Sequence, residues 1–132
     1  MSVIPDTYMD LLGAKPAFAS LATVMKDGSP QVTPVWFDYA GGKIRVNTAR
    51  GRVKARTLKP AARVALSILD PQNPYRYVQV RGRVVSATET GAAEHIDTLA
   101  KKYLGQDKYP FTQPGEVRVM YEIEPTSASG NG

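Results

Sequence analysis

Four basic side chains, Arg50, Arg52, Lys54 and Arg56, fall at every second position around Gly51. The alternating residues before Gly51 predict a strand, and those after it predict a short helix-like turn. A strand that runs into a helix start leaves backbone N–H groups unpaired, which favours an anion. Arginine adds a planar fork matched to phosphate oxygens, and lysine adds a compact charge. The pattern therefore predicts a phosphate clamp, with a solvated basic turn as the alternative, because no P-loop or dinucleotide fingerprint is present.

Positive charge is concentrated in one part of the chain. Residues 43–83 contain eleven of the seventeen basic residues and a single acid, Asp70, so this window carries +10 in a chain of net charge +5. A protein that needs only solubility intersperses its charges. The concentration indicates an anionic partner, which could be nucleic acid, a membrane surface, or a phosphorylated or carboxylated small molecule. The charge alone leaves these three open.

Length and composition fit one domain over residues 1–132, with the small polar tail at 127–132 expected to fray. No cysteine is present, so disulfides, thiolate nucleophiles and thiolate metal sites are excluded. No apolar run is long enough to span a bilayer, and the first residues lack the features of a signal peptide. We therefore expect no membrane insertion and a cytoplasmic protein.

Hydrophobic alternation predicts a mainly β protein with few helices. Pro34 lies within one of the predicted strands, which places that strand at a sheet edge or at a bulge, because proline cannot donate a ladder hydrogen bond. Strands of this number and length predict a compact β-barrel. The expected strands are 17–25, 31–39, 43–49, 63–69, 77–88 and 116–124, and the expected helices are 5–12 and 91–104.

Residues with acid–base chemistry are few. His95 is the only histidine, and with no serine or second histidine nearby in the sequence we expect it to be a partly exposed helix residue. No carboxylate pair shares a motif, and the spacing of metal ligands is absent. A hydrolase is therefore not expected, and an enzyme of this composition would depend on a cofactor for its chemistry.

Four segments in order, 21–23, 27–36, 47–54 and 75–84, resemble successive motifs of one family. This is the pyridoxamine-phosphate-oxidase-like split β-barrel family, in its flavin/deazaflavin oxidoreductase branch that uses coenzyme F420. With the loop at 109–111 and the last strand, the resemblance covers nearly the whole chain. It implies a six-stranded split barrel that forms a homodimer, with two cofactor sites between the subunits.

The resemblance also implies where the cofactor binds. The deazaflavin ring would lie along residues 33–36, and the cofactor phosphate would bind Arg52 and Lys54. Tyr75, Tyr77 and Tyr109 are candidates for the substrate cleft. The implied cofactor-binding residues are Thr33, Pro34, Val35, Trp36, Asn47, Thr48, Ala49, Arg50, Gly51, Arg52, Lys54 and Gln79.

The function that the resemblance implies is an F420-dependent reductase that transfers a hydride to an unsaturated or conjugated acceptor. One alternative uses FMN in the same barrel, as an oxidase or a flavin reductase. A second alternative is a non-catalytic binder of an anionic cofactor. Nucleic acid is not an expected partner, because the basic window lacks interleaved aromatic residues apart from Tyr75 and Tyr77.

Overall fold

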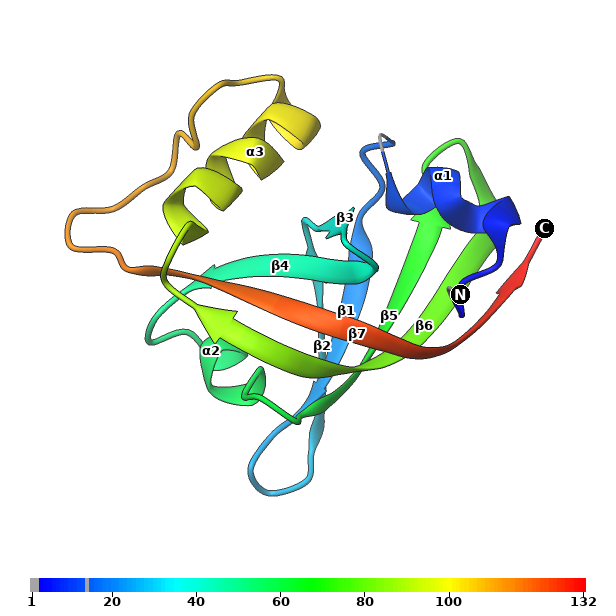
Figure 1. Ribbon diagram of the computed structural model, residues 1–132, viewed down its shortest axis with the longest axis horizontal. Helices are drawn as coiled ribbons and strands as arrows, with labels where there is room; N and C mark the ends of the chain where they lie inside the picture. Colours follow the sequence, from blue (N-terminus) through cyan, green and yellow to red (C-terminus); the bar gives the residue numbers. More distant parts are fainter. Residues whose placement is uncertain (1–2, 14) are drawn as a thin grey trace.

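The computed structural model describes residues 3–13 and 15–132 (Figure 1). In this part of the chain, seven antiparallel strands form one sheet in the order β2-β1-β5-β6-β7-β4-β3. The elements in chain order are η1 (Asp6–Tyr8), α1 (Met9–Leu12), β1 (Ala19–Val24), β2 (Pro30–Val35), β3 (Asp38–Ala40), β4 (Lys43–Ala49), α2 (Val53–Thr57), β5 (Arg63–Asp70), β6 (Asn73–Thr88), α3 (Ala92–Leu104) and β7 (Arg118–Asn131).

The sheet curls into a barrel because its two edge strands follow each other in the sequence. β2 and β3 lie at opposite ends of the strand order, yet only Trp36 and Phe37 separate them. A flat sheet would place these edges roughly 29 Å apart at the usual strand spacing. The chain from Val35 to Asp38 spans at most about 11 Å. The two edges must therefore approach each other, which confirms the mainly β barrel predicted from the sequence.

The single strand predicted over 31–39 is divided in two, so the sheet has one strand more than the six expected. The division falls at Trp36 and Phe37, where the chain crosses from one edge of the sheet to the other. Phe37 is fully buried and fills the interior at this corner. Pro34 lies in β2 at the end of the strand order, so the edge position predicted for its strand is confirmed.

The core lies inside the curl and is built from alternate residues of the strands. In β4, for example, Ile44 and Val46 are buried, whereas Arg45 and Asn47, which alternate with them, are half-buried on the other face. Helix α3 covers that other face and packs against β4 and β7 (Figure 1). The helix predicted over 91–104 is thereby confirmed, and it ends at Gly105, whose φ of 71° suits a glycine cap.

The C-terminal residues are ordered, so the expectation that 127–132 would fray is wrong for most of that segment. Residues 127–131 continue β7 and pair with the first half of β6, from Tyr77 to Arg81. β6 is sixteen residues long, and this half of it would otherwise have an unpaired edge next to β7. Gly130 lies against the ring of Tyr8, which attaches the N-terminal segment to the same strand.

Gly130→Ala should lower the free energy of unfolding by about 1–3 kcal/mol, because overpacking of a tight contact forces neighbours to move. A Cβ at this position would lie 2.5 Å from Tyr8 Cζ and 2.7 Å from the carbonyl oxygen of Tyr77. Urea unfolding measures the effect, and the exposed neighbour Ser129 supplies the control Ser129→Ala. Equal stabilities of the two variants would show that the tail does not dock as described.

Candidate functional site

The basic turn and the edge of the sheet meet at one contact. β4 ends at Ala49, the chain turns at Gly51 with a φ of 88°, and α2 begins after Arg52. This turn carries Lys54 to β2, where its ammonium donates a hydrogen bond to Thr33 Oγ1 at 3.1 Å. Two segments that the resemblance assigns to one cofactor site, 21 residues apart in the sequence, are therefore in contact.

The basic side chains of the turn point to different partners. Arg50 forms an ion pair with Glu89, and Arg52 Nη2 lies 3.8 Å from Glu116 Oε1. Carboxylates from outside the turn therefore compensate two of its positive charges.

Lys54 differs from these arginines, because within residues 3–13 and 15–132 no carboxylate pairs with its ammonium. Burial, together with the positive charge of Arg52, lowers the pKa of Lys54. A half-buried ammonium without a counter-ion can form a charge-assisted hydrogen bond with an anion. The contact of Lys54 with Thr33 at the sheet edge therefore favours the phosphate clamp over a merely solvated basic turn.

An aromatic cluster adjoins the end of β2. The indole of Trp36 stacks on the ring of Tyr103, with centroids 5.2 Å apart and planes 4° apart. Tyr109 meets Trp36 edge-on at 6.0 Å, so this substrate-cleft candidate does lie beside the predicted ring-binding segment. The Tyr103 hydroxyl donates to the carbonyl oxygen of Ala17 at 2.6 Å, and burial raises its pKa to about 12. Tyr103 therefore holds Trp36 in place and is a poor proton donor.

The two residues before Trp36 face opposite sides of β2. Pro34 is exposed and lies opposite Ser20 of β1, whereas Val35 packs against the core opposite Ala19. Because β2 ends the sheet, one side of its backbone has no partner strand. A flat ligand can approach that side without displacing a strand.

His95 is buried, with 4% of its surface exposed, so the expectation of a partly exposed helix residue is wrong. Its Nδ1 lies 3.0 Å from Asn47 Nδ2, and its Nε2 lies 3.1 Å from Asp38 Oδ1. The Asn47 oxygen accepts from Arg118 Nε at 2.8 Å, which fixes the orientation of the amide. Asn47 must then donate to His95 Nδ1, so the proton of the neutral imidazole lies on Nε2 and is donated to Asp38.

This polar network continues to the basic turn. Arg118 Nη1 donates to Glu116 Oε1 at 2.8 Å, and both side chains are buried. The same Glu116 oxygen is the partner of Arg52. Asn47 also donates to the carbonyl oxygen of Ala92 at the start of α3. Asn47 is therefore fully engaged with protein groups, and it positions α3 and Arg118 instead of offering its amide to a ligand.

Two further residues assigned by the resemblance are buried at the end of β4. Ala49 pairs with Arg118 across the β4–β7 ladder, and Thr48 is 1% exposed. The Thr48 hydroxyl is the one buried side-chain polar atom without a hydrogen-bond partner in the described part of the chain. An unpaired buried hydroxyl costs free energy, and a polar group that bonded to it would recover that cost.

Asp38 makes the network sensitive to acid. Although burial raises its pKa, hydrogen bonds from His95 and Arg45 lower it to about 2 from the ordinary 3.8. A carboxyl whose pKa is lower in the folded state stabilises the fold above pH 4 and loses that contribution as the pH falls toward 2.

We expect Asp38 to contribute about 2 kcal/mol to this loss of unfolding free energy. Urea unfolding at about pH 5 and about pH 2 measures it, and Asp38→Asn should lose less stability over the interval than the wild type. Other carboxyls titrate in the same range, so the contribution of Asp38 is the difference between the losses of the two proteins. Equal losses would show that Asp38 does not contribute to the acid sensitivity.

The remaining predicted residues lie elsewhere. Tyr75, Tyr77 and Gln79 project from the outer face of β6, which is three strands away from β2 in the sheet. Tyr77 has Leu69 and Asn131 as its cross-strand neighbours. One chain therefore does not bring these residues to the contact between Lys54 and Thr33.

Comparison with known proteins identifies the architecture. The profile of the pyridoxamine 5'-phosphate oxidase family matches residues 4–130. The chain belongs to this family. An F420 reductase of known structure is 35% identical to it, over 96% of this chain and 98% of its own, with a TM-score of 0.81. The family resemblance and the split β-barrel predicted from the sequence are thereby confirmed. No curated protein matches the chain in sequence.

More distant members of the fold show how widely it is used. A conserved hypothetical protein from Mycobacterium tuberculosis is 22% identical, with a TM-score of 0.73, over 98% of this chain and 86% of its own. The FAD and heme binding protein from Mycobacterium smegmatis is 19% identical, with a TM-score of 0.70, over 98% of this chain and 71% of its own. At these identities the likeness shows the fold alone.

The chemistry available to this family member is limited on the protein side. In residues 3–13 and 15–132, no group of three histidine or acidic side chains could hold a metal ion. None of the helices in that part is long and apolar enough to cross a membrane. His95, the single imidazole, is enclosed by Asp38 and Asn47. The side chains around Lys54 can bind and orient an anionic molecule, and redox chemistry would have to come from that molecule.

Proposed function

We propose that this protein is an F420-dependent reductase that transfers a hydride between the deazaflavin and an unsaturated or conjugated small molecule. The observation that carries the proposal is the contact of Lys54 with Thr33, which puts a cation without a counter-ion at the free edge of β2. The similarity to an F420 reductase over nearly the whole of both chains supports the choice of cofactor.

The residues at this edge fit a phosphorylated flat ring. Lys54 and Arg52 offer an ammonium and a guanidinium, and Thr33 offers a hydroxyl, which together match the oxygens of a phosphate. The free edge of β2 leads from Pro34 to the indole of Trp36, which is stacked on Tyr103, and a flat ring would lie along this edge. When bound, the deazaflavin would supply the hydride. Gly51 gives backbone approach at the turn, and Arg50, paired with Glu89, is a weaker candidate for a cofactor contact.

The part of this chain in catalysis is to bind, orient and exclude water. Trp36 is held by Tyr103 on one side and met by Tyr109 on another, so the ring-binding segment is preorganised. Tyr109 is half-buried and close enough to this segment to contact an acceptor. The hydroxyl proton of Tyr103 and the Nε2 proton of His95 are donated to Ala17 and Asp38, so neither is directed at an acceptor beside Trp36.

FMN is the alternative cofactor, because its phosphate and flat ring fit the same groups and the family is related to flavin enzymes. The experiment is hydride transfer from reduced F420 and from reduced FMN to a quinone and to a conjugated dye. The proposal predicts turnover with F420 and little with FMN. Turnover only from reduced FMN would make the protein a flavin enzyme, and tight binding without turnover would make it a carrier.

We extend the proposal to a homodimer that shares its cofactor sites. Leu69 and Tyr77 lie opposite each other and form an exposed apolar end on the outer face of the sheet, which a second copy would cover. Gln79 lies on the same face and cannot join Lys54 within one chain. Light scattering at micromolar and nanomolar concentrations should give the dimer mass. A monomer that binds the cofactor with full affinity would contradict the shared site.

A further inference from the structure

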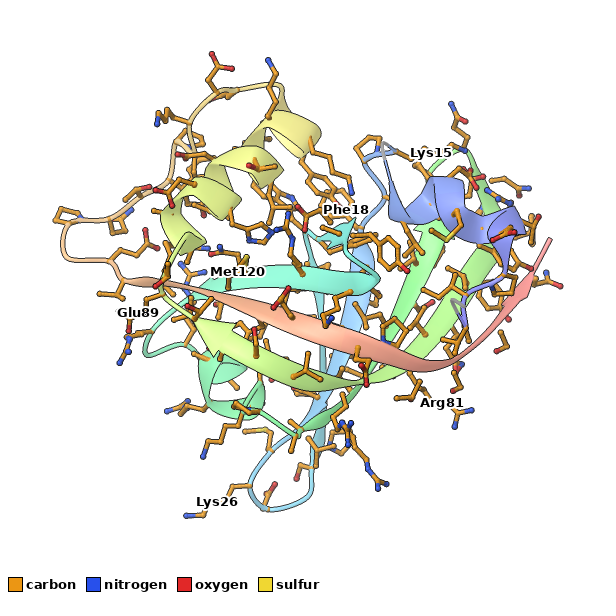
Figure 2. The ribbon with its side chains drawn as sticks, in the orientation of Figure 1. Lys15, Phe18, Lys26, Arg81, Glu89 and Met120 are labelled. Atoms are coloured by element: carbon orange, nitrogen blue, oxygen red, sulfur yellow. The ribbon has the colours of Figure 1, made fainter. Side chains whose placement is uncertain are left out.

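Three arginines gather on the outer face of the sheet, apart from the basic turn. Arg63 of β5 lies directly opposite Arg83 of β6, and Arg81 follows on the same face opposite Ala65. All three side chains are exposed, and Figure 2 shows Arg81 extending outward from its strand. Like charges directly opposite each other in a ladder destabilise a sheet. This arrangement therefore lowers stability unless an anion binds there.

Carboxylates from the protein do little to neutralise these charges. Glu124 lies 3.7 Å from Arg83, and both side chains are about half exposed. An exposed pair at this distance contributes little. Within residues 3–13 and 15–132, Arg63 and Arg81 have no ion pair. Two guanidinium groups are thus available to an external anion.

A groove of about 620 Å³ lies beside the three arginines. Its floor is made of small residues, because Ala22, Ala65 and Ser127 are in line with Arg81 across four strands. Val24 and Pro30 form part of its wall. The groove therefore combines a low floor, an apolar wall and a row of positive charges, which suits an extended anion.

The outer face has a basic end and an apolar end. Along β6, Arg83 and Arg81 lie toward one end, Gln79 in the middle and Tyr77 toward the other. The antiparallel strand β5 places Arg63 opposite Arg83 and Leu69 opposite Tyr77. The apolar end is the one assigned to the dimer contact above. The basic end with its groove is thus a separate feature of the same face.

We propose that Arg63, Arg81 and Arg83 form a binding site for a polyanion, a ligand with several carboxylates or phosphates in series. Guanidinium groups bind both kinds of anion through paired hydrogen bonds. One source of such a ligand is the polyglutamate tail of the F420 cofactor, and this assignment rests on the proposed function. The other source is a separate polyphosphate or polycarboxylate.

Calorimetric titration tests the site directly, with tri-γ-glutamate and tripolyphosphate as probes. The variant Arg63→Gln/Arg81→Gln should bind the better probe at least about tenfold more weakly than the wild type, because two charge-assisted contacts are lost. The control Lys101→Gln/Lys108→Gln removes the same charge from exposed positions in and after α3 and should change the affinity less than about twofold. Equal binding by the two variants, or no saturable binding by the wild type, would overturn the proposal.

Thermal unfolding supplies a second readout with the opposite sign. Because Arg63 faces Arg83, removing Arg63 and Arg81 should raise the melting temperature by a few degrees, roughly 2–4 °C, relative to the control variant. If the variant both binds the probe more weakly and has a lower melting temperature than the control variant, the substitutions have damaged the sheet, and this result would count against the proposed site.

Cofactors with different numbers of glutamates distinguish the two sources. If the tail occupies the groove, affinity for F420 rises with tail length in the wild type and is independent of it in Arg63→Gln/Arg81→Gln. If both proteins respond equally to tail length while only the variant loses tripolyphosphate, the ligand is a separate polyanion. Failure of the proposed function gives a different result: the wild type does not transfer a hydride from reduced F420, while the groove still binds tri-γ-glutamate or tripolyphosphate.

Discussion

Lys54→Ala should weaken cofactor binding by roughly ten- to a hundredfold, because a charge-assisted hydrogen bond contributes about 1.5–3 kcal/mol. Lys54 has a half-buried ammonium, a hydroxyl partner in Thr33 and no carboxylate partner in the described part of the chain. Arg52→Ala should act in the same direction. Quenching of Trp36, the single tryptophan, reports binding.

The comparison of FMN with riboflavin isolates the phosphate in this experiment. Lys54→Ala should weaken the binding of FMN and leave that of riboflavin nearly unchanged. Arg56→Ala is the matched control, because Arg56 is an exposed basic residue of the same short helix α2. If Lys54→Ala and Arg56→Ala titrate alike, the phosphate binds elsewhere and the clamp assignment fails.

Arg118→Met should lower the free energy of unfolding by about 3–5 kcal/mol, because it removes the buried partner of the Glu116 carboxylate and leaves only the exposed Arg52 at 3.8 Å. Arg118 and Glu116 form an ion pair at 2.8 Å, and both side chains are almost completely buried. Arg118 also donates to Asn47, so the variant removes one support of the contact between Asn47 and His95. Urea unfolding measures the loss.

The double variant Arg118→Met/Glu116→Gln provides the control for this prediction. It also removes the buried negative charge of Glu116 and should regain a large part of the stability that Arg118→Met loses. If the loss of stability in the double variant equals the sum of the losses in Arg118→Met and in Glu116→Gln, the two residues are not coupled. The buried network between α3 and the barrel would then be only a set of separate contacts.

The sequence predicted the features that depend on local pattern. Alternation located most of the strands, and the apolar stripe located α3 to within one residue. Pro34 predicted an edge strand because its missing N–H is a local property. The basic turn was recognised from charge spacing around Gly51. Each of these signals lies within a few residues of the chain.

Features that depend on long-range contacts could not be predicted in this way. His95 has an ordinary place on the helix, and its burial follows from Asp38 and Asn47, which lie 57 and 48 residues away. The tail at 127–132 has the composition of a frayed end, yet the unpaired half of β6 orders most of it. Glu116 gave no sequence signal that it would approach Arg52.

The most direct test of the F420 assignment is a pair of titrations of the wild type, one with F420 and one with FMN. Quenching of Trp36 fluorescence monitors binding, and each titration is run at low and at moderate salt. The account predicts tighter binding of F420, with a steeper loss of affinity as salt rises, because exposed charges are screened within about 10 Å at 0.1 M. Tighter binding of FMN with the steeper salt dependence would contradict the F420 assignment.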